Sequence, residues 1–137
     1  MMAIAHAVLD TDTLSAIMRQ DPTVIPKART YLLQHSQFTL SIITRYEILR
    51  GLKAKHATKQ VVNFDRFCER SRTLPITDEV VVRAAETYAT LSEEGKLIVD
   101  ADILIAASAL VYQLSIVTNN EDHFKRIRDL QVENWPK

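Results

Sequence analysis

This chain of 137 residues has one cysteine, two glycines and no net charge, and each shortage excludes a class of protein. Because Cys68 has no second cysteine to pair with, no internal disulfide can form. Two glycines are too few for a phosphate-binding loop of the P-loop or dinucleotide type. The balance of 17 basic and 17 acidic residues argues against a protein that coats nucleic acid through its overall field, although it permits a local basic rim around an acidic cleft.

The sequence also lacks any apolar run long enough to span a membrane. Its first seven residues have no basic start, so they are not typical of a signal peptide. The four histidines are too scattered for a zinc motif, and each is interpreted as a surface or loop residue: His6, His35, His56 and His123. The chain is 47% hydrophobic, enough to fill one core. These features predict a cytoplasmic protein with a single domain over residues 1–137.

Apolar segments with strand character alternate along the chain with segments of helical periodicity. Strands are predicted over residues 5–10, 38–43 and 114–118, with a short strand at most over 74–77 and an edge strand over 131–135. Helices are predicted over residues 11–19, 24–34, 44–55, 58–70, 78–92, 102–113 and 121–128. This alternation predicts an α/β protein, a compact three-layer α/β/α sandwich with a mainly parallel central sheet. In such sheets the working site lies beyond the carboxyl ends of the strands.

Three acidic residues stand in or beside apolar segments, namely Asp10, Glu47 and Asp102. A carboxylate removed from water is unfavourable unless it is paired or holds a cation. Three carboxylates that converge on one point would repel each other unless a cation lay between them. Because oxygen ligands suit Mg²⁺ or Mn²⁺, the residues favour a divalent-metal site that hydrolyses a phosphodiester.

Each acid also has a purely structural interpretation. Asp10 is suited to cap the helix that follows, and Asp12 could take that position instead. Thr44 and Glu47 have the spacing of a capping box, in which Glu47 folds back onto the Thr44 amide. Asp102 begins a helix, but that helix is almost wholly apolar, and a cap alone rarely justifies a charge inside a molecule.

Asp12 and four further polar residues are candidates for a supporting role. Asp100 either caps its helix or reaches the cation through water. Asn120 is placed to cap the turn that follows it, whereas Glu121 and Asp122 complement the dipole of a short helix. Any of the last three could instead orient a metal-bound water.

Basic residues gather around the helix that carries Glu47. A solvated face is the default interpretation of such a run, but beside an acidic cleft it can hold a nucleic-acid backbone through phosphate contacts. The candidates for such contacts are Arg45, Arg50 and Lys53.

With these motifs taken in order, the chain resembles the PIN-domain ribonucleases, and more narrowly the VapC-type toxins of bacterial type II toxin–antitoxin pairs. The resemblance covers nearly the whole chain and rests on VLDTDTLS (residues 8–15), ITRYEILRG (43–51), DADILIAA (100–107), VTNN (117–120) and VENW (132–135). It implies a metal-dependent endoribonuclease whose acids are Asp10, Glu47 and Asp102, with Mg²⁺ or Mn²⁺ as cofactor. It further implies an RNA substrate, self-association into a homodimer and a small cognate antitoxin that masks the cleft.

The chain departs from the family pattern at two positions. Asp12 stands where the family usually has asparagine, which adds a negative charge near the metal. Asn120 stands where many members place a fourth acid. These departures keep a second class open, a catalytically degenerate PIN-like module that binds RNA or acts as a scaffold. A phosphatase-like or DNA-directed metal nuclease is a third possibility.

Overall fold

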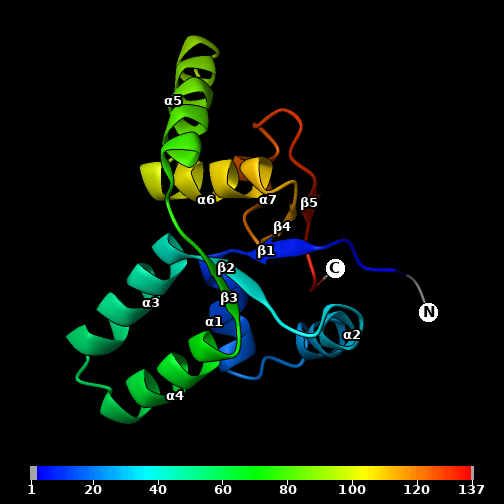
Figure 1. Ribbon diagram of the computed structural model, residues 1–137, viewed down its shortest axis with the longest axis vertical. Helices are drawn as coiled ribbons and strands as arrows, with labels where there is room; N and C mark the ends of the chain where they lie inside the picture. The colour runs from blue at the N-terminus through cyan, green and yellow to red at the C-terminus, as the bar shows by residue number, and fades with distance from the viewer. Residues whose placement is uncertain (1–2, 137) are drawn as a thin grey trace.

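The structure is a computed structural model that describes residues 3–136, and its centre is a five-stranded sheet in which every neighbouring pair of strands is parallel (Figure 1). Its strands lie in the order β3-β2-β1-β4-β5. Their bounds are Ala7–Leu9 for β1, Thr39–Ser41 for β2, Arg72–Leu74 for β3, Ser115–Val117 for β4 and Val132–Glu133 for β5. The predicted domain (residues 1–137) and the segment considered as a signal peptide (residues 1–7) include Met1, Met2 or Lys137. These three residues lie outside the described part.

Seven helices connect the strands of the described chain. Their bounds are Thr11–Met18 for α1, Ile25–His35 for α2, Ile42–Ala54 for α3, Thr58–Glu69 for α4, Asp78–Glu93 for α5, Asp100–Val111 for α6 and Glu121–Phe124 for α7. None of these helices, within residues 3–136, combines the length and the apolar character needed to cross a bilayer.

The sheet separates two hydrophobic cores because successive strand side chains point to opposite faces. On one face Val8 and Ile116 pack with α5 and α6. On the other face Leu9 and Val117 pack with residues of α1, α2 and α4. The predicted three-layer α/β/α sandwich with a parallel sheet is therefore confirmed.

Several element boundaries differ from the predictions for identifiable reasons. The third helix begins at Ile42 rather than Thr44, because the Ser41 hydroxyl accepts a hydrogen bond from the Ile43 amide at 3.1 Å and caps the helix directly after β2. Strand β3 covers Arg72–Leu74 rather than residues 74–77, since Pro75 has no amide hydrogen to donate to a strand ladder.

Two helices that border the site also differ from prediction. Helix α6 begins at Asp100, so Asp102 lies inside its first turn. Helix α7 ends at Phe124 rather than Arg128, because the Arg126 and Ile127 amides bond three residues back, to His123 and Phe124, and tighten the backbone.

Thr77 offers a direct test of local helix capping. Its hydroxyl accepts a hydrogen bond from the Val80 amide at 3.2 Å and caps α5. We expect Thr77→Ala to lower the free energy of unfolding by about 1 kcal/mol in urea titrations, because one amide loses its partner. Thr77→Ser keeps the hydroxyl and should retain most of that stability; equal losses in the two variants would contradict the capping role.

Candidate active site

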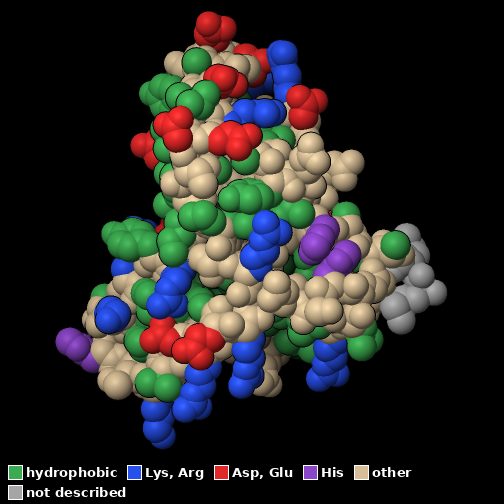
Figure 2. All heavy atoms as spheres, in the orientation of Figure 1, with side chains coloured by type: hydrophobic (Ala, Val, Ile, Leu, Met, Phe, Trp, Pro, Cys, Tyr) green, Lys and Arg blue, Asp and Glu red, His purple; other side chains and the backbone are tan. Residues whose placement is uncertain are grey.

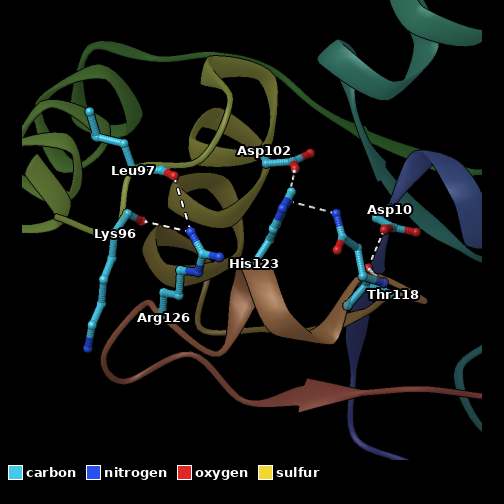
Figure 3. A network of polar contacts seen from close by, with 8 residues as sticks. Asp10, Lys96, Leu97, Asp102, Thr118, His123 and Arg126 are labelled. Carbon is cyan, nitrogen blue, oxygen red and sulfur yellow. Dashed lines mark hydrogen bonds and ion pairs between the residues drawn. The ribbon is translucent and has the colours of Figure 1, made fainter.

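Asp10 lies where the carboxyl ends of β1 and β4 meet. The register pairs Leu9 with Val117, and the Asp10 amide donates to the Val117 carbonyl at 3.0 Å. Asp10 is only 4% exposed. One oxygen accepts from the Thr13 amide at 2.8 Å and the other accepts from the Thr118 hydroxyl, as Figure 3 shows for the second contact. Asp10 is thus the cap of α1, as predicted, whereas the alternative that Asp12 caps this helix is wrong because Asp12 lies within the first turn.

The surroundings of Asp10 disfavour its charged form. Burial raises the pKa of this carboxyl to about 6, and the nearby charge of Asp12 adds to the rise, although hydrogen bonds from Thr118 and Thr13 oppose it. The fold therefore keeps a carboxylate in a place where its negative charge is only partly compensated. Strained electrostatics of this kind are typical of functional sites.

Glu47 lies on α3 and is held from the neighbouring helix α1. The Thr11 hydroxyl donates to Glu47 Oε1 at 2.7 Å, and Arg50 Nη2 lies 3.8 Å from Oε2. The predicted capping box is wrong, because Ser41 caps α3 and Thr44 is buried within the helix, 3.1 Å from the Thr11 hydroxyl. Glu47 is consequently tied to the helix that Asp10 caps.

Asp102 lies in the first turn of α6 with its side chain 21% exposed. Its Oδ2 is 3.3 Å from His123 Nδ1 on α7, a contact drawn in Figure 3. Burial raises the pKa of Asp102, His123 lowers it, and the charges of Glu47 and Asp12 raise it again. Asp102 therefore shares one electrostatic neighbourhood with acids from α1 and α3.

The side chains around Asp10 and Asp102 are of the type that binds a divalent cation, but they are not grouped as a complete binding site. Carboxylates are hard oxygen donors, and a divalent cation would relieve both their repulsion and the burial of Asp10. Residues 3–136 nevertheless contain no group of three or more histidine, cysteine, aspartate or glutamate side chains arranged to hold one ion. The donor set thus fits Mg²⁺ or Mn²⁺ held by one or two carboxylates, with water completing the coordination.

The predicted supporting residues lie in different surroundings. Asp12, Asp100 and Asp122 are exposed in the first turns of α1, α6 and α7. Glu121 pairs with Lys125 at 3.5 Å and accepts from Asn134 at 3.2 Å.

Asn120 occupies the cap position of α7 but makes no side-chain cap bond, so the predicted capping role is wrong. Its amide nitrogen Nδ2 lies 2.7 Å from His123 Nδ1, and its backbone amide donates to the Thr118 hydroxyl at 2.8 Å. Asn120 thus contacts partners of both Asp10 and Asp102.

The three basic candidates differ in their availability. Arg45 is engaged, with Nη2 3.0 Å from Asp65 Oδ1 and its guanidinium over the Phe64 ring. Arg50 is 59% exposed beside Glu47 and Lys53 is exposed on the same helix. In the view of Figure 2, acidic side chains gather over α5 whereas most lysines and arginines lie around α3 and α4. Arg50 and Lys53 are therefore better placed than Arg45 to meet a phosphate backbone.

Three residues of this site were not predicted as members of it. Thr11 and Thr118 hold Glu47 and Asp10, and His123 contacts Asp102. Thr118 had a sequence signal, because it is the last residue of a predicted strand whose carboxyl end reaches the same sheet edge as Asp10. His123 had none, since only the packing of α7 against α6 brings it to Asp102.

Comparisons with known proteins identify the family of this chain. The PIN domain family matches residues 7–130. Ribonuclease VapC1 of Methanocaldococcus jannaschii is 33% identical over 98 residues, which cover 72% of this chain and 70% of that protein. Ribonuclease VapC1 of Haemophilus influenzae (strain R2866) is 28% identical over 130 residues, or 94% of this chain and 97% of that protein.

A solved structure of VapBC-1 from nontypeable Haemophilus influenzae superposes on this fold with a TM-score of 0.85 at 26% identity, covering 96% of this chain and 98% of that one. A parallel sheet with Asp10 at its carboxyl edge, a family match over residues 7–130 and relatives that cover 72% and 94% of the chain lead to one assignment. The chain belongs to the PIN-domain family and, within it, to the VapC-type ribonucleases.

Proposed function

We propose that this protein is a divalent-metal-dependent endoribonuclease, the toxin component of a toxin–antitoxin pair, in which Asp10, Glu47 and Asp102 are the working acids. The observation that carries the proposal is that Asp102 feels the charges of Glu47 and Asp12, and Asp12 also acts on the buried Asp10. Burial raises the pKa of Asp10 to about 6. Burial also raises the pKa of Asp102, as do the charges of Glu47 and Asp12, whereas His123 lowers it. A site that accumulates uncompensated negative charge in this way is suited to a cation.

Asp10 and Asp102 would hold the ion, and Glu47 would join them directly or through water. Bound Mg²⁺ or Mn²⁺ would supply the chemistry that these side chains lack, acidification of the attacking water and stabilisation of charge on the departing oxygen. The chain itself orients the acids: Thr118 and the Thr13 amide hold Asp10, and Thr11 holds Glu47.

RNA binding would depend on the exposed basic residues of α3. Arg50 lies 3.8 Å from Glu47, so a phosphate that it contacts lies close to the acids. Lys53 follows one turn later on the same helix. Contacts of this kind position the backbone without reading its sequence.

The partners follow from the relatives. These relatives are ribonucleases by name, and the similar structure from Haemophilus influenzae is of VapBC-1, which supports a cognate antitoxin for this chain. We further infer that the protein pairs with itself and acts in the cytoplasm.

Metal removal tests the proposal directly. The purified protein is expected to cleave RNA in Mg²⁺ or Mn²⁺, and chelation with EDTA should lower the initial rate by at least about 100-fold, because the ion would acidify the attacking water and stabilise the departing oxygen. Readdition of Mn²⁺ should restore cleavage. Single-stranded DNA of the same sequence serves as the matched control; equal cleavage of the two, or cleavage that resists EDTA, would overturn the assignment.

A second candidate function is a degenerate PIN-like module that binds RNA or acts as a scaffold. It is favoured by Asn120 in the place of a fourth acid and by the lack, within residues 3–136, of three acids already grouped around one point. Calorimetry separates the two functions, since a degenerate site should release no heat when Mn²⁺ is added.

A further inference from the structure

A single short segment contacts both acids that are proposed to hold the cation. Thr118, which directly follows β4, donates its hydroxyl hydrogen to Asp10 and accepts from the backbone amide of Asn120 at 2.8 Å. The Asn120 side chain lies 2.7 Å from His123 Nδ1, and the same nitrogen lies 3.3 Å from Asp102 Oδ2. Residues 118–123 thus link two carboxylates that are 92 positions apart in the sequence.

The imidazole of His123 is held between two partners through one ring nitrogen. When Nδ1 carries a proton, it can donate a hydrogen bond to the Asp102 carboxylate. When it does not, it can accept one from the side-chain amide of Asn120. A neighbouring carboxylate favours the tautomer that donates to it. One partner therefore keeps the ring in place in either form.

The backbone that carries His123 is itself fixed to the start of α6. Arg126 Nη1 donates to the carbonyl oxygens of Lys96 at 3.3 Å and Leu97 at 3.2 Å, just before the helix of Asp102 (Figure 3). Phe124, next to His123, is fully buried in the core with α6. These contacts hold α7 against α6 and thereby keep His123 close to Asp102.

We propose that His123, steadied by Asn120, is a positioning residue that orients Asp102 for the cation and thereby sets its carboxylate relative to Asp10. This inference rests on the proposed metal site. With Oδ2 directed at His123, no hydrogen bond within residues 3–136 occupies Oδ1, which leaves that oxygen for the ion. Groups that orient a metal-binding carboxylate commonly change metal affinity by 10- to 100-fold.

His123 could also act against the cation, and its removal would then change the metal affinity in the opposite direction. If His123 instead competes with the cation for Oδ2, its removal should tighten binding, because a contact made only in the cation-free state weakens binding. The direction of the change in Mn²⁺ affinity therefore decides between orientation and competition.

The experiment is calorimetric titration of the whole cation-free protein with Mn²⁺ in the absence of RNA. We expect His123→Ala to raise the Kd by about 10-fold or more. His123→Asn should restore most of the affinity, since its side-chain amide nitrogen takes a position similar to that of the ring Nδ1. Asn120→Ala, which removes the partner that steadies the ring, should raise the Kd by a smaller factor. His56→Asn replaces an exposed histidine elsewhere and should leave the Kd unchanged.

The outcomes separate the inference from the proposed function. A wild-type protein that takes up no Mn²⁺ overturns both. A wild-type protein that binds Mn²⁺, with Asp102→Asn losing binding but His123→Ala unchanged or tighter, overturns the inference alone. A merely structural role for His123 would lower the unfolding midpoint of the cation-free variant and leave its Kd unchanged, which is a third measurable pattern and also contradicts positioning. If His123→Ala does not fold, an unchanged Kd in Asn120→Ala has the same consequence.

Discussion

Asp102→Asn is expected to lower the rate of RNA cleavage by at least about 100-fold while the protein remains folded. Asparagine has nearly the same shape as aspartate and can still contact His123, which lies 3.3 Å from the carboxylate. It cannot carry the negative charge that holds a divalent cation. The repulsion that Glu47 and Asp12 exert on Asp102 also disappears, so the fold has no electrostatic reason to weaken.

The same loss is expected for Asp10→Asn, because that residue is the second proposed ligand. Asp129→Asn is the matched control, since it makes the same chemical change at an exposed loop residue with φ 66, a conformation that asparagine tolerates. Initial rates on one RNA substrate, with circular dichroism to check folding, measure all three variants. Cleavage that persists in both purified site variants would defeat the proposed mechanism, as would an equal loss in Asp129→Asn. Induced expression provides an independent readout, since growth arrest by the wild type should be relieved in both site variants.

The sequence predicted the position of Asp10 because strand ends follow a simple rule. Two buried apolar segments, each followed by polar residues, predict parallel strands whose carboxyl ends share an edge, and Asp10 and Thr118 do meet there. The same reasoning identified the acid of α6, since a helix that is apolar on nearly all sides carries its first turn into the interior. Periodicity thus located both acids without any knowledge of side-chain contacts.

Other features could not be predicted because competing local solutions look alike in a sequence. Ser41 and Thr44 are both good helix caps, and the choice depends on where β2 stops pairing with β1 and β3. His123 appeared to be an isolated histidine because its contact with Asp102 depends on how α7 packs on α6. Arg45 appeared as available as Arg50, and its contacts with Asp65 and Phe64 of α4 distinguish them. In each case the deciding contact is tertiary.

Asp10 also governs an expected dependence of stability on pH. In the unfolded chain its pKa is close to 3.8, whereas burial raises it to about 6 in the folded protein. Below about pH 4 both states are protonated, and the residue does not penalise folding. As the pH rises from about 4 to about 6 the unfolded chain releases its proton first, so the folded state loses stability. A difference of about two pKa units corresponds to about 3 kcal/mol, fully developed above about pH 6.

Asp10→Asn should therefore be more stable than the wild type at pH 7 in metal-free buffer, although we expect it to be inactive. We expect a gain of about 1–3 kcal/mol in the free energy of unfolding, below the full value where the amide pairs less well with Thr118. Urea titrations from pH 4 to pH 8 measure the difference between the two proteins, which cancels the contribution of other carboxylates. The difference should grow between about pH 4 and about pH 6 and then level off. Parallel pH profiles for the two proteins would contradict the raised pKa of Asp10.

Saturating Mn²⁺ should change the relative stability of the wild type and Asp10→Asn. A cation that binds only the folded state adds about 2.7 kcal/mol of stability at 100 times its Kd. The wild type should gain this stability at pH 7, whereas Asp10→Asn should gain little, so the order of stability of the two proteins should reverse or nearly so. Equal stabilisation of both by Mn²⁺ would mean that the ion binds without Asp10. A carboxylate that destabilises the cation-free fold and stabilises it once the ion is bound is the arrangement expected where a site is maintained for activity rather than for folding.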